Sequence, residues 1–272
     1  MKSFIPTPSH SAVALGPFTV HFYALCILVG VITAITIGRS RYVRSVGNPD
    51  EITDVAIFAI PAGIIGGRIY HVITSPERYF GSNGHPLDAV KIWDGGMGIW
   101  GAIALGTLVA YLIFRSRDRS LTFAEFADAL APGLLIAQAI GRLGNWFNGE
   151  LFGGPTQLPW GLKIPLELRP AGFENYETFH PTFLYEGLWS LICAFALIAL
   201  TKRWQTQSGN LFLAYIALYC LGRSGTEYLR IDQAEHILGL RLNEWVSLLG
   251  LILSSFTILH RHRKYERGII TS

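Results

Sequence analysis

Long apolar runs, separated by short polar segments, dominate the sequence. Seven of them are long enough to be membrane helices, at about residues 17–38, 52–73, 96–114, 123–143, 182–201, 209–228 and 242–260. A helix needs about 20 mainly apolar residues to cross the hydrocarbon core of a bilayer. Prolines and glycines interrupt the second and fourth runs, but membrane helices tolerate both. The pattern predicts an all-α integral membrane protein with about seven transmembrane helices.

The segment 145–180, between the fourth and fifth runs, differs from the rest of the chain. It is rich in glycine, proline and aromatic residues. The segment is too polar to cross a bilayer and too aromatic for a plain linker. We predict that it forms a small head at the membrane surface, inserted into a single polytopic membrane domain over residues 1–272.

The composition agrees with a membrane protein and excludes several other classes. Hydrophobic residues make up 50% of the chain and charged residues 15%, whereas soluble domains have about 25% charged residues. Disorder is excluded because it requires low hydrophobicity. The net charge of +3 comes without a basic stripe on a soluble segment, so no nucleic-acid partner is expected. The three cysteines lack metal-ligand or redox spacing, and we interpret them as small core residues: Cys26, Cys193 and Cys220.

The placement of lysine and arginine predicts the orientation of the helices. Seven positive residues are spread over longer loops on one side. Twelve others crowd four short segments, after the first, third, fifth and seventh runs: Arg39, Arg41, Arg44, Arg115, Arg117, Arg119, Lys202, Arg203, Arg261, Arg263, Lys264 and Arg267. The crowded side is expected to be cytoplasmic, because cytoplasmic loops carry an excess of positive charge. The N-terminus and the head then face outward, and the C-terminus lies in the cytoplasm.

Three arginines fall within the apolar runs or at their ends: Arg68, Arg142 and Arg223. A charge at the centre of a bilayer costs about 2.5–3.5 kcal/mol on insertion scales, so such a residue usually faces a cavity or a partner. Two alternatives involve neither binding nor catalysis. The arginine side chain extends from a helix end to the membrane surface, or it forms a structural ion pair. For Arg68 both interpretations stay open, whereas the neighbours of Arg142 and Arg223 favour a functional site.

Arg142 lies in a polar segment, 141–154, at the boundary of the fourth run. The segment also contains Asn145, Asn148 and Glu150. Arg142 and Asn145 are three residues apart, so they share a face wherever the helix continues. A guanidinium donates two parallel hydrogen bonds to a phosphate, which a single ammonium group cannot match. The segment therefore predicts a site for an anionic, hydroxyl-bearing ligand, with a hydrogen-bonded loop without a ligand as the alternative.

The sixth run carries a polar stripe of Tyr219, Arg223, Glu227 and Arg230. Their spacing places all four along one side of a helix. An Arg223–Glu227 pair is expected in any case. Sealing that pair in lipid would be costly unless it also lined a polar cavity.

Five motifs occur in order along the chain: HFYAL around Tyr23, GGRI (Gly66 to Ile69), WDGGM (Trp93 to Met97), GRLGNWFNGELFG (Gly141 to Gly153) and HPTFLYE (His180 to Glu186). Together they resemble the motifs of the bacterial prolipoprotein diacylglyceryl transferases. The resemblance runs from about Val20 to Arg230, and the long motif with GRLGN and NGE is highly specific to that family.

The resemblance implies an activity and a location. Members of the family are multi-pass enzymes of the bacterial inner membrane. They transfer the diacylglyceryl group of phosphatidylglycerol to the lipobox cysteine thiol of a preprolipoprotein signal peptide. A thioether forms and glycerol phosphate leaves. The partners implied are phosphatidylglycerol and the signal peptide within a lipid membrane, and no metal or cofactor is implied.

The resemblance also assigns roles to single residues of this chain. Arg142 matches an arginine that contacts phosphatidylglycerol, and Arg223 matches an arginine that would stabilise the leaving phosphate, although these two roles could be exchanged. The residues expected to be catalytic are Arg223, Glu150, Tyr23 and Glu227. Those expected to bind phosphatidylglycerol are Arg142, Asn145, Asn148 and Gly153.

The chain departs from the family pattern at two positions. Trp100 stands where well-known members have a histidine that is a favoured candidate for the general base. Tryptophan cannot accept a proton, so Glu150, Glu227, Tyr23 or the phosphate itself would have to accept the proton of the thiol. Phe183 stands where glutamine is common.

Two other functions are compatible with buried arginines. One is a transporter or channel for an anionic solute, with the arginines along its path. The other is a non-catalytic protein that binds lipid or a signal peptide, which the missing histidine would favour. Polar groups gathered at one membrane boundary favour a site over a continuous channel.

Overall fold

The computed structural model describes residues 4–16, 18–116, 121–204, 207–232 and 236–266. Of the residues that enter the predictions above, Pro17, Arg117, Arg119 and Arg267 lie outside this described part. The chain divides into two compact units. The first unit comprises residues 1–38 and 127–272, and the second unit comprises residues 39–126.

A helix occupies each of the seven apolar runs within the described residues. These helices are α1 (Phe22–Arg44), α2 (Pro49–Thr74), α4 (Ile99–Arg115), α5 (Phe123–Asn148), α6 (Thr182–Trp204), α7 (Asn210–Glu227) and α8 (Leu242–Glu266). By length and hydropathy, five of them could cross a membrane, namely α1, α2, α5, α6 and α8. Helix α4 is apolar but has 17 residues, and α7 has 18 residues with two charges. The protein is therefore mostly helical and has the helices of an integral membrane protein.

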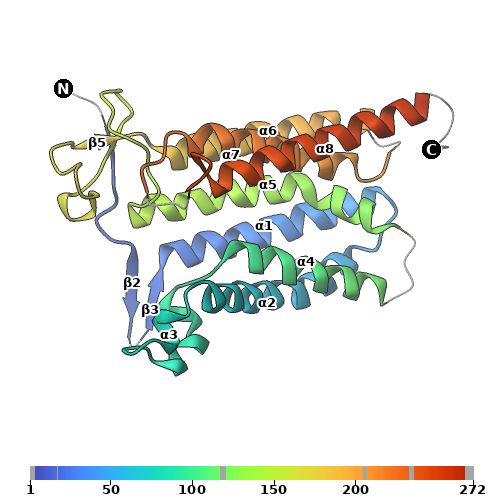
Figure 1. The fold of residues 1–272 in the computed structure, drawn as a ribbon. Helices are drawn as coiled ribbons and strands as arrows, with labels where there is room; N and C mark the ends of the chain where they lie inside the picture. Colours follow the sequence, from blue (N-terminus) through green and yellow to red (C-terminus); the bar gives the residue numbers. More distant parts are fainter. Residues whose placement is uncertain (1–3, 17, 117–120, 205–206, 233–235, 267–272) are drawn as a thin grey trace. The chain divides into compact units, whose positions relative to one another are not determined.

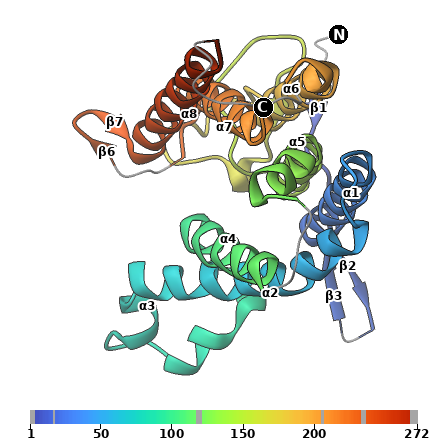
Figure 2. The ribbon, with the colours of Figure 1, turned by 90° about the vertical axis from the view of Figure 1, so that its right-hand side faces the viewer.

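In the first unit, α5 to α8 run alongside one another (Figure 1). Helix α7 lies between α6 and α8 (Figure 2). Small and apolar side chains of three helices form a buried core: Ala131 and Leu135 of α5, Cys193, Ala194 and Leu197 of α6, and Leu211 and Ala214 of α7. Small residues allow the helix backbones to approach closely. This packing fixes the polar residues that the same three helices carry nearer to the head.

The head lies beyond one end of these helices and contains a small three-stranded sheet (Figure 1). Strand β4 (Leu162–Lys163) pairs in parallel with β1 (Ile5–Pro6) and antiparallel with β5 (Thr178–Phe179). The side chains of Leu162, Ile164 and Phe179 are fully buried beneath it. Helix α5 continues to Asn148, so the first four residues of the predicted head segment, 145–148, belong to the helix. The sequence also did not predict that the N-terminal segment supplies a strand of the head.

Two hairpins lead into helices of the first unit. Strands β2 (Ala12–Leu15) and β3 (Phe18–His21) precede α1, so the first run becomes helical at Phe22 rather than near residue 17. Strands β6 (His236–Ile237) and β7 (Leu240–Arg241) pair directly before α8. This second hairpin brings Arg241 to the end of α7.

In the second unit, glycines allow α2 and α4 to cross in close contact. A Cβ atom on Gly66 would lie 2.3 Å from the carbonyl oxygen of Gly101, and one on Gly101 would lie 2.1 Å from that of Gly66. A side chain on either residue would separate the helices. The connection between them contains α3 (Glu77–Phe80) and the 3-10 helices η1 (Pro86–Val90) and η2 (Ile92–Asp94).

The α2–α4 crossing predicts the effect of two glycine substitutions. Gly66→Ala should reduce the free energy of unfolding by about 1–3 kcal/mol or more, since overpacking forces backbones apart. Gly63→Ala is the matched control, because its Cβ would lie 3.4 Å from the nearest atom, the carbonyl oxygen of Ala102. Thermal unfolding of the detergent-solubilised variants measures both effects. Equal melting temperatures for the two variants would contradict this account of the crossing.

Candidate active site

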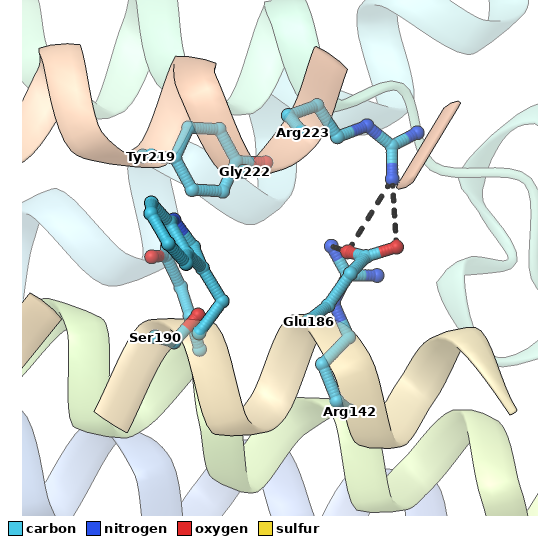
Figure 3. A pocket seen from close by; sticks show the side chains of 8 residues that line it. Arg142, Glu186, Ser190, Tyr219, Gly222 and Arg223 are labelled. Atoms are coloured by element: carbon cyan, nitrogen blue, oxygen red, sulfur yellow. Dashed lines mark hydrogen bonds and ion pairs between the residues drawn. The ribbon is translucent and has the colours of Figure 1, made fainter. Parts of the chain in front are cut away.

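Three helices of the first unit bring two arginines to one carboxylate. Arg142 of α5 forms an ion pair with Glu186 of α6 through Nη2 and Oε2. Arg223 of α7 approaches the same carboxylate, with Nη1 3.3 Å from Oε1 and 3.4 Å from Oε2. Figure 3 shows the Arg223 guanidinium joined to the Glu186 carboxylate by dashed lines, with the Arg142 side chain reaching the same carboxylate from another helix. Residues that are 81 positions apart in the sequence thus meet at one point.

Burial explains why these three charges must stay together. The exposed fractions of the side chains are 20% for Arg142, 12% for Arg223 and 7% for Glu186. Taking an ion out of water costs several kcal/mol, and removing one partner of a buried pair typically destabilises a protein by about 3–5 kcal/mol. Glu186 therefore has a structural task, because it holds both arginines in place.

Ion pairs continue from Arg223 along the end of α7. Its Nη2 lies 2.6 Å from Oε2 of Glu227, and the other oxygen of Glu227 lies 3.1 Å from Nη1 of Arg241. Nη2 of Arg241 lies 3.3 Å from Oδ2 of Asp232. Arg230 donates two hydrogen bonds to Asp232, of 2.7 and 2.9 Å. The predicted Arg223–Glu227 pair is thus present, as part of a longer chain of charges.

Hydrogen bonds extend this chain from Arg142 to the polar loop after α5. Nη1 of Arg142 lies 3.4 Å from Oδ1 of Asn145, which is a long contact. The side-chain amides of Asn145 and Asn148 donate to Oε1 of Glu150, at 3.0 and 3.1 Å. The last two turns of α5 and the loop after it thus place four predicted site residues in one network.

A small pocket lies beside the two arginines, between α5, α6 and α7 (Figure 3). It is lined by Gln138, Arg142, Glu186, Trp189, Ser190, Tyr219, Gly222 and Arg223. Gln138 donates to the hydroxyl of Tyr215 at 3.0 Å, and its buried Oε1 has no hydrogen-bond partner among the described residues. Cations, hydroxyl groups and an amide oxygen in one pocket suit a ligand that carries both a phosphate and hydroxyl groups.

Comparisons with known proteins agree with this arrangement. The family model of the prolipoprotein diacylglyceryl transferases matches residues 10–260. The chain belongs to this family. A relative from Streptomyces coelicolor, named phosphatidylglycerol–prolipoprotein diacylglyceryl transferase 2, is 48% identical over 267 residues, which cover 97% of this chain and 84% of the relative.

Two further relatives carry the same family name. The phosphatidylglycerol–prolipoprotein diacylglyceryl transferase of Cutibacterium acnes is 49% identical over 264 residues, covering 97% of this chain and 88% of the relative. That of Bifidobacterium adolescentis is 46% identical over 263 residues, covering 92% and 78%. Membership of the prolipoprotein diacylglyceryl transferase family therefore extends over nearly the whole chain.

Two of the residues expected from the diacylglyceryl transferase resemblance make other kinds of contact. Tyr23 of α1 packs against α5, where a Cβ atom on Gly144 would lie 2.5 Å from its ring. Gly153 packs between the head and the segment after α7, and a Cβ atom there would lie 2.8 Å from Cβ of His180 and 2.9 Å from the carbonyl oxygen of Leu229. Gly153 thus makes backbone and packing contacts, among them a β-bridge with Arg230, rather than contacts with the guanidinium groups of Arg142 and Arg223.

In the second unit, Arg68 holds the WDGGM motif of the diacylglyceryl transferases. Its guanidinium donates to the carbonyl oxygens of Ala89 at 2.8 Å and Gly96 at 3.0 Å, and also to those of Asp88 and Gly95. This buried cation therefore fixes a loop, and its structural interpretation is the better supported of the two. Trp100 lies in the first turn of α4 and is partly buried.

Three charged residues of the network are not assigned to the site by the sequence pattern: Glu186, Asp232 and Arg241. Glu186 is the last residue of the HPTFLYE motif, and Asp232 and Arg241 lie between the sixth and seventh apolar runs. Glu186 had one detectable signal, because it is an acidic residue in the first turns of an otherwise apolar helix. Arg241 had none, since its partners Glu227 and Asp232 precede it across a hairpin. Within the described residues, no group of three or more His, Cys, Asp or Glu side chains could hold a metal ion.

Asp232 gives a prediction for stability as a function of pH. Burial alone would raise the pKa of Asp232, but the hydrogen bonds and charge of Arg230, with the charge of Arg241, outweigh burial and lower it. The pKa in the folded state thus lies below the value of about 3.9 in the unfolded chain. The carboxylate therefore adds stability above that unfolded value and loses it as the pH falls through the folded value.

Asp232→Asn should reduce the free energy of unfolding near neutral pH by about 1–3 kcal/mol, the usual range for hydrogen bonds to charged groups. The difference from the wild type should shrink in acid. Thermal unfolding in detergent over a series of pH values measures it. Asp50→Asn is the control, because Asp50 is exposed and its pair with Arg39 should add at most about 1 kcal/mol. A deficit for Asp232→Asn that stays constant down to acid pH would contradict the assignment.

Proposed function

We propose that this protein transfers the diacylglyceryl group of phosphatidylglycerol to the lipobox cysteine thiol of preprolipoproteins. The thiolate sulfur attacks the glyceryl carbon that bears the phosphate, a C–S bond forms as the C–O bond breaks, and glycerol phosphate leaves. The observation that carries this proposal is the convergence of Arg142 and Arg223 beside a pocket with hydroxyl and amide groups. Membership of the diacylglyceryl transferase family supports the reaction.

The charge of the network suits a phosphodiester. The residues joined directly by ion pairs, which do not include Glu150, are four arginines and three carboxylates, so this chain of ion pairs carries one excess positive charge. A phosphodiester carries one negative charge and would balance it. Charge balance matters here because an unpaired ion in a buried site is costly.

Both arginines retain hydrogen-bonding capacity for that phosphate. A guanidinium has five N–H donors, and the contacts of Arg142 within the described residues involve two of its three nitrogens. We assign Arg142 to the headgroup phosphate and Arg223 to the charge that grows on the leaving phosphate. Donors fixed in a dry site stabilise such a developing charge much better than water does.

Glu150 is the group we assign to accept the proton of the thiol. Its Oε1 takes both amide hydrogen bonds, and Oε2 has no hydrogen-bond partner among the described residues. Glu227 is less suited to this role, because each of its oxygens lies within ion-pair distance of an arginine. Asn145 and Asn148 then orient Glu150, and Tyr23 packs behind the end of α5.

The membrane setting follows from the helices and the charge pattern. We infer seven crossings of the bacterial inner membrane, formed by α1, α2, α4, α5, α6, α7 and α8. The N-terminus and the head would face outward and the C-terminus the cytoplasm, as the positive residues of the loops indicate. The chain would then act as one polytopic membrane domain, with its site near the outer surface, where a lipobox cysteine can reach the lipid headgroup. Gly153 would hold the head against the end of α7 there.

Lysine substitutions should separate the roles of the two arginines. Arg142→Lys keeps the charge but cannot donate two parallel hydrogen bonds to the phosphate. KM for phosphatidylglycerol should therefore rise about tenfold or more, with a smaller change in kcat. Arg223→Lys should lower kcat about 10²-fold with little change in KM, as expected when one donor to a developing charge is lost. The measurement is the diacylglyceryl mass increase of a lipobox peptide in micelles containing phosphatidylglycerol.

Arg261→Lys is the matched control for this measurement. Arg261 donates to the carbonyl oxygen of Ser208 at 2.9 Å, far along α8 from the pocket. If Arg142→Lys and Arg223→Lys also have wild-type kinetics, the two arginines have no part in the mechanism. The absence of any mass increase with the wild-type protein would contradict the proposed reaction.

Glu150→Gln tests the assignment of the base. The glutamine side chain keeps the shape of glutamate and one hydrogen-bond acceptor, but it cannot accept the proton of the thiol. The kcat near neutral pH should therefore fall about 10²-fold or more. The deficit should narrow as the pH rises past about 8.5, where a free thiol ionises without help. Trp100→Phe is the control and should keep measurable turnover throughout. A deficit for Glu150→Gln that does not change with pH would contradict its role as base.

A further inference from the structure

Arg241 is a buried cation that none of the recognised motifs contains. It ends the β6–β7 hairpin and has 6% of its surface exposed. We propose that Arg241 is a positioning residue, which fixes the carboxylate of Glu227 and thereby the guanidinium of Arg223. This inference rests on the proposed function, because it assigns Arg241 a share in the same transfer reaction.

The contacts of Arg241 join both ends of the segment that follows α7. Nη1 lies 3.1 Å from Oε1 of Glu227 and 3.5 Å from its carbonyl oxygen. Nη2 lies 3.3 Å from Oδ2 of Asp232 and also donates to its carbonyl oxygen. One guanidinium thus holds the last residue of α7 and the segment five residues further on. The end of α7 is set by this cation rather than by packing alone.

Glu227 divides its two oxygens between two arginines. Oε2 lies 2.6 Å from Nη2 of Arg223, and Oε1 lies 3.1 Å from Nη1 of Arg241. The Glu227 side chain has 1% of its surface exposed, so water cannot replace a lost partner. The amide of Asn243 is 3.5 Å from Oε1, which is too long to replace a cation.

Loss of Arg241 should therefore change the position of Arg223. Arginine and carboxylate prefer a bidentate pair with two parallel hydrogen bonds. With Oε1 released, Glu227 would bind the Arg223 guanidinium with both oxygens. Arg223 would then turn away from Glu186, to which it is now joined at 3.3 Å. Arg241 prevents this by occupying one oxygen of Glu227.

The backbone conformation around Arg241 directs its side chain toward the end of α7. The hairpin turns at Leu238 and Gly239, both with positive φ. The backbone N–H of Arg241 donates to Oε2 of Glu244 at 2.8 Å, and Glu244 lies in the first turn of α8. The beginning of α8 thus anchors the main chain of Arg241 while its side chain reaches back to α7.

Kinetic constants distinguish positioning from a purely structural role. Arg241→Gln should lower kcat for diacylglyceryl transfer about 10- to 100-fold, since small misplacements of catalytic groups have effects of this size. KM for phosphatidylglycerol should stay within about threefold, because Arg142 keeps its partner Glu186. Arg241→Lys should recover part of the loss, as it restores a cation but not both contacts. Arg261→Gln, which removes the same charge near the other end of α8, should behave like the wild type.

A double-mutant cycle tests whether Arg241 acts through Glu227. Glu227→Asp shortens the side chain, so one carboxylate can no longer reach both arginines. If Arg241 acts through Glu227, Arg241→Gln should reduce kcat much less in the Glu227→Asp background than in the wild type. Equal fold-losses in both backgrounds would overturn the inference, as would a wild-type kcat for folded Arg241→Gln.

The test remains decisive if Arg241→Gln does not fold. Arg241→Lys then carries it, with a lower kcat and an unchanged KM expected, and wild-type kcat overturning the inference. Turnover by the wild-type protein distinguishes a failure of the role of Arg241 from a failure of the proposed function. Turnover by the wild type with an unaffected Arg241→Gln variant rejects only the role of Arg241, whereas no turnover by the wild type rejects the proposed function.

Discussion

The carboxylate of Glu186, shared by Arg142 and Arg223, is the contact on which the interior of the first unit depends. Isolated charges between membrane helices would be too costly, so each charge needs a partner on another element. Glu186 meets this need for two arginines at once and thereby ties α5, α6 and α7 together. Glu227 does the same between Arg223 and the hairpin that precedes α8. Helix packing and the polar site are thus consequences of one arrangement of charges.

The same arrangement supports a chemical role. The chain of ion pairs, which contains more arginines than carboxylates, holds cationic side chains in fixed positions and still attracts one negative charge. Such preorganisation stabilises charge that develops during a reaction, because the donors need not reorganise at that moment. The pocket next to the arginines and the polar loop that ends in Glu150 extend this charged site toward the head. A channel would instead need polar residues along the whole length of the helices, whereas the core formed by Leu135, Leu197 and Leu211 is apolar and closed.

Much of the helical architecture could be predicted from the sequence, because apolar runs of about 20 residues have few alternatives. Arg142, Asn145, Asn148 and Glu150 could be grouped because they are neighbours in the chain, and Arg223 and Glu227 because they are four residues apart on a helix. The bridging role of Glu186 and the position of Arg241 could not be predicted, since both depend on how separate elements pack. The first strand of the head was missed for the same reason. The start of α1 was misplaced because a short apolar stretch such as 18–20 fits a strand as well as a helix.

The most direct test of the central claim is a structure of the protein with a short-chain phosphatidylglycerol bound. The account predicts that the lipid phosphate lies within hydrogen-bond distance of the guanidinium groups of both Arg142 and Arg223, in the pocket between α5, α6 and α7. The distances from phosphate oxygens to guanidinium nitrogens are the quantities to measure. A lipid phosphate bound elsewhere, with both guanidinium groups occupied only by Glu186 and Glu227, would contradict it.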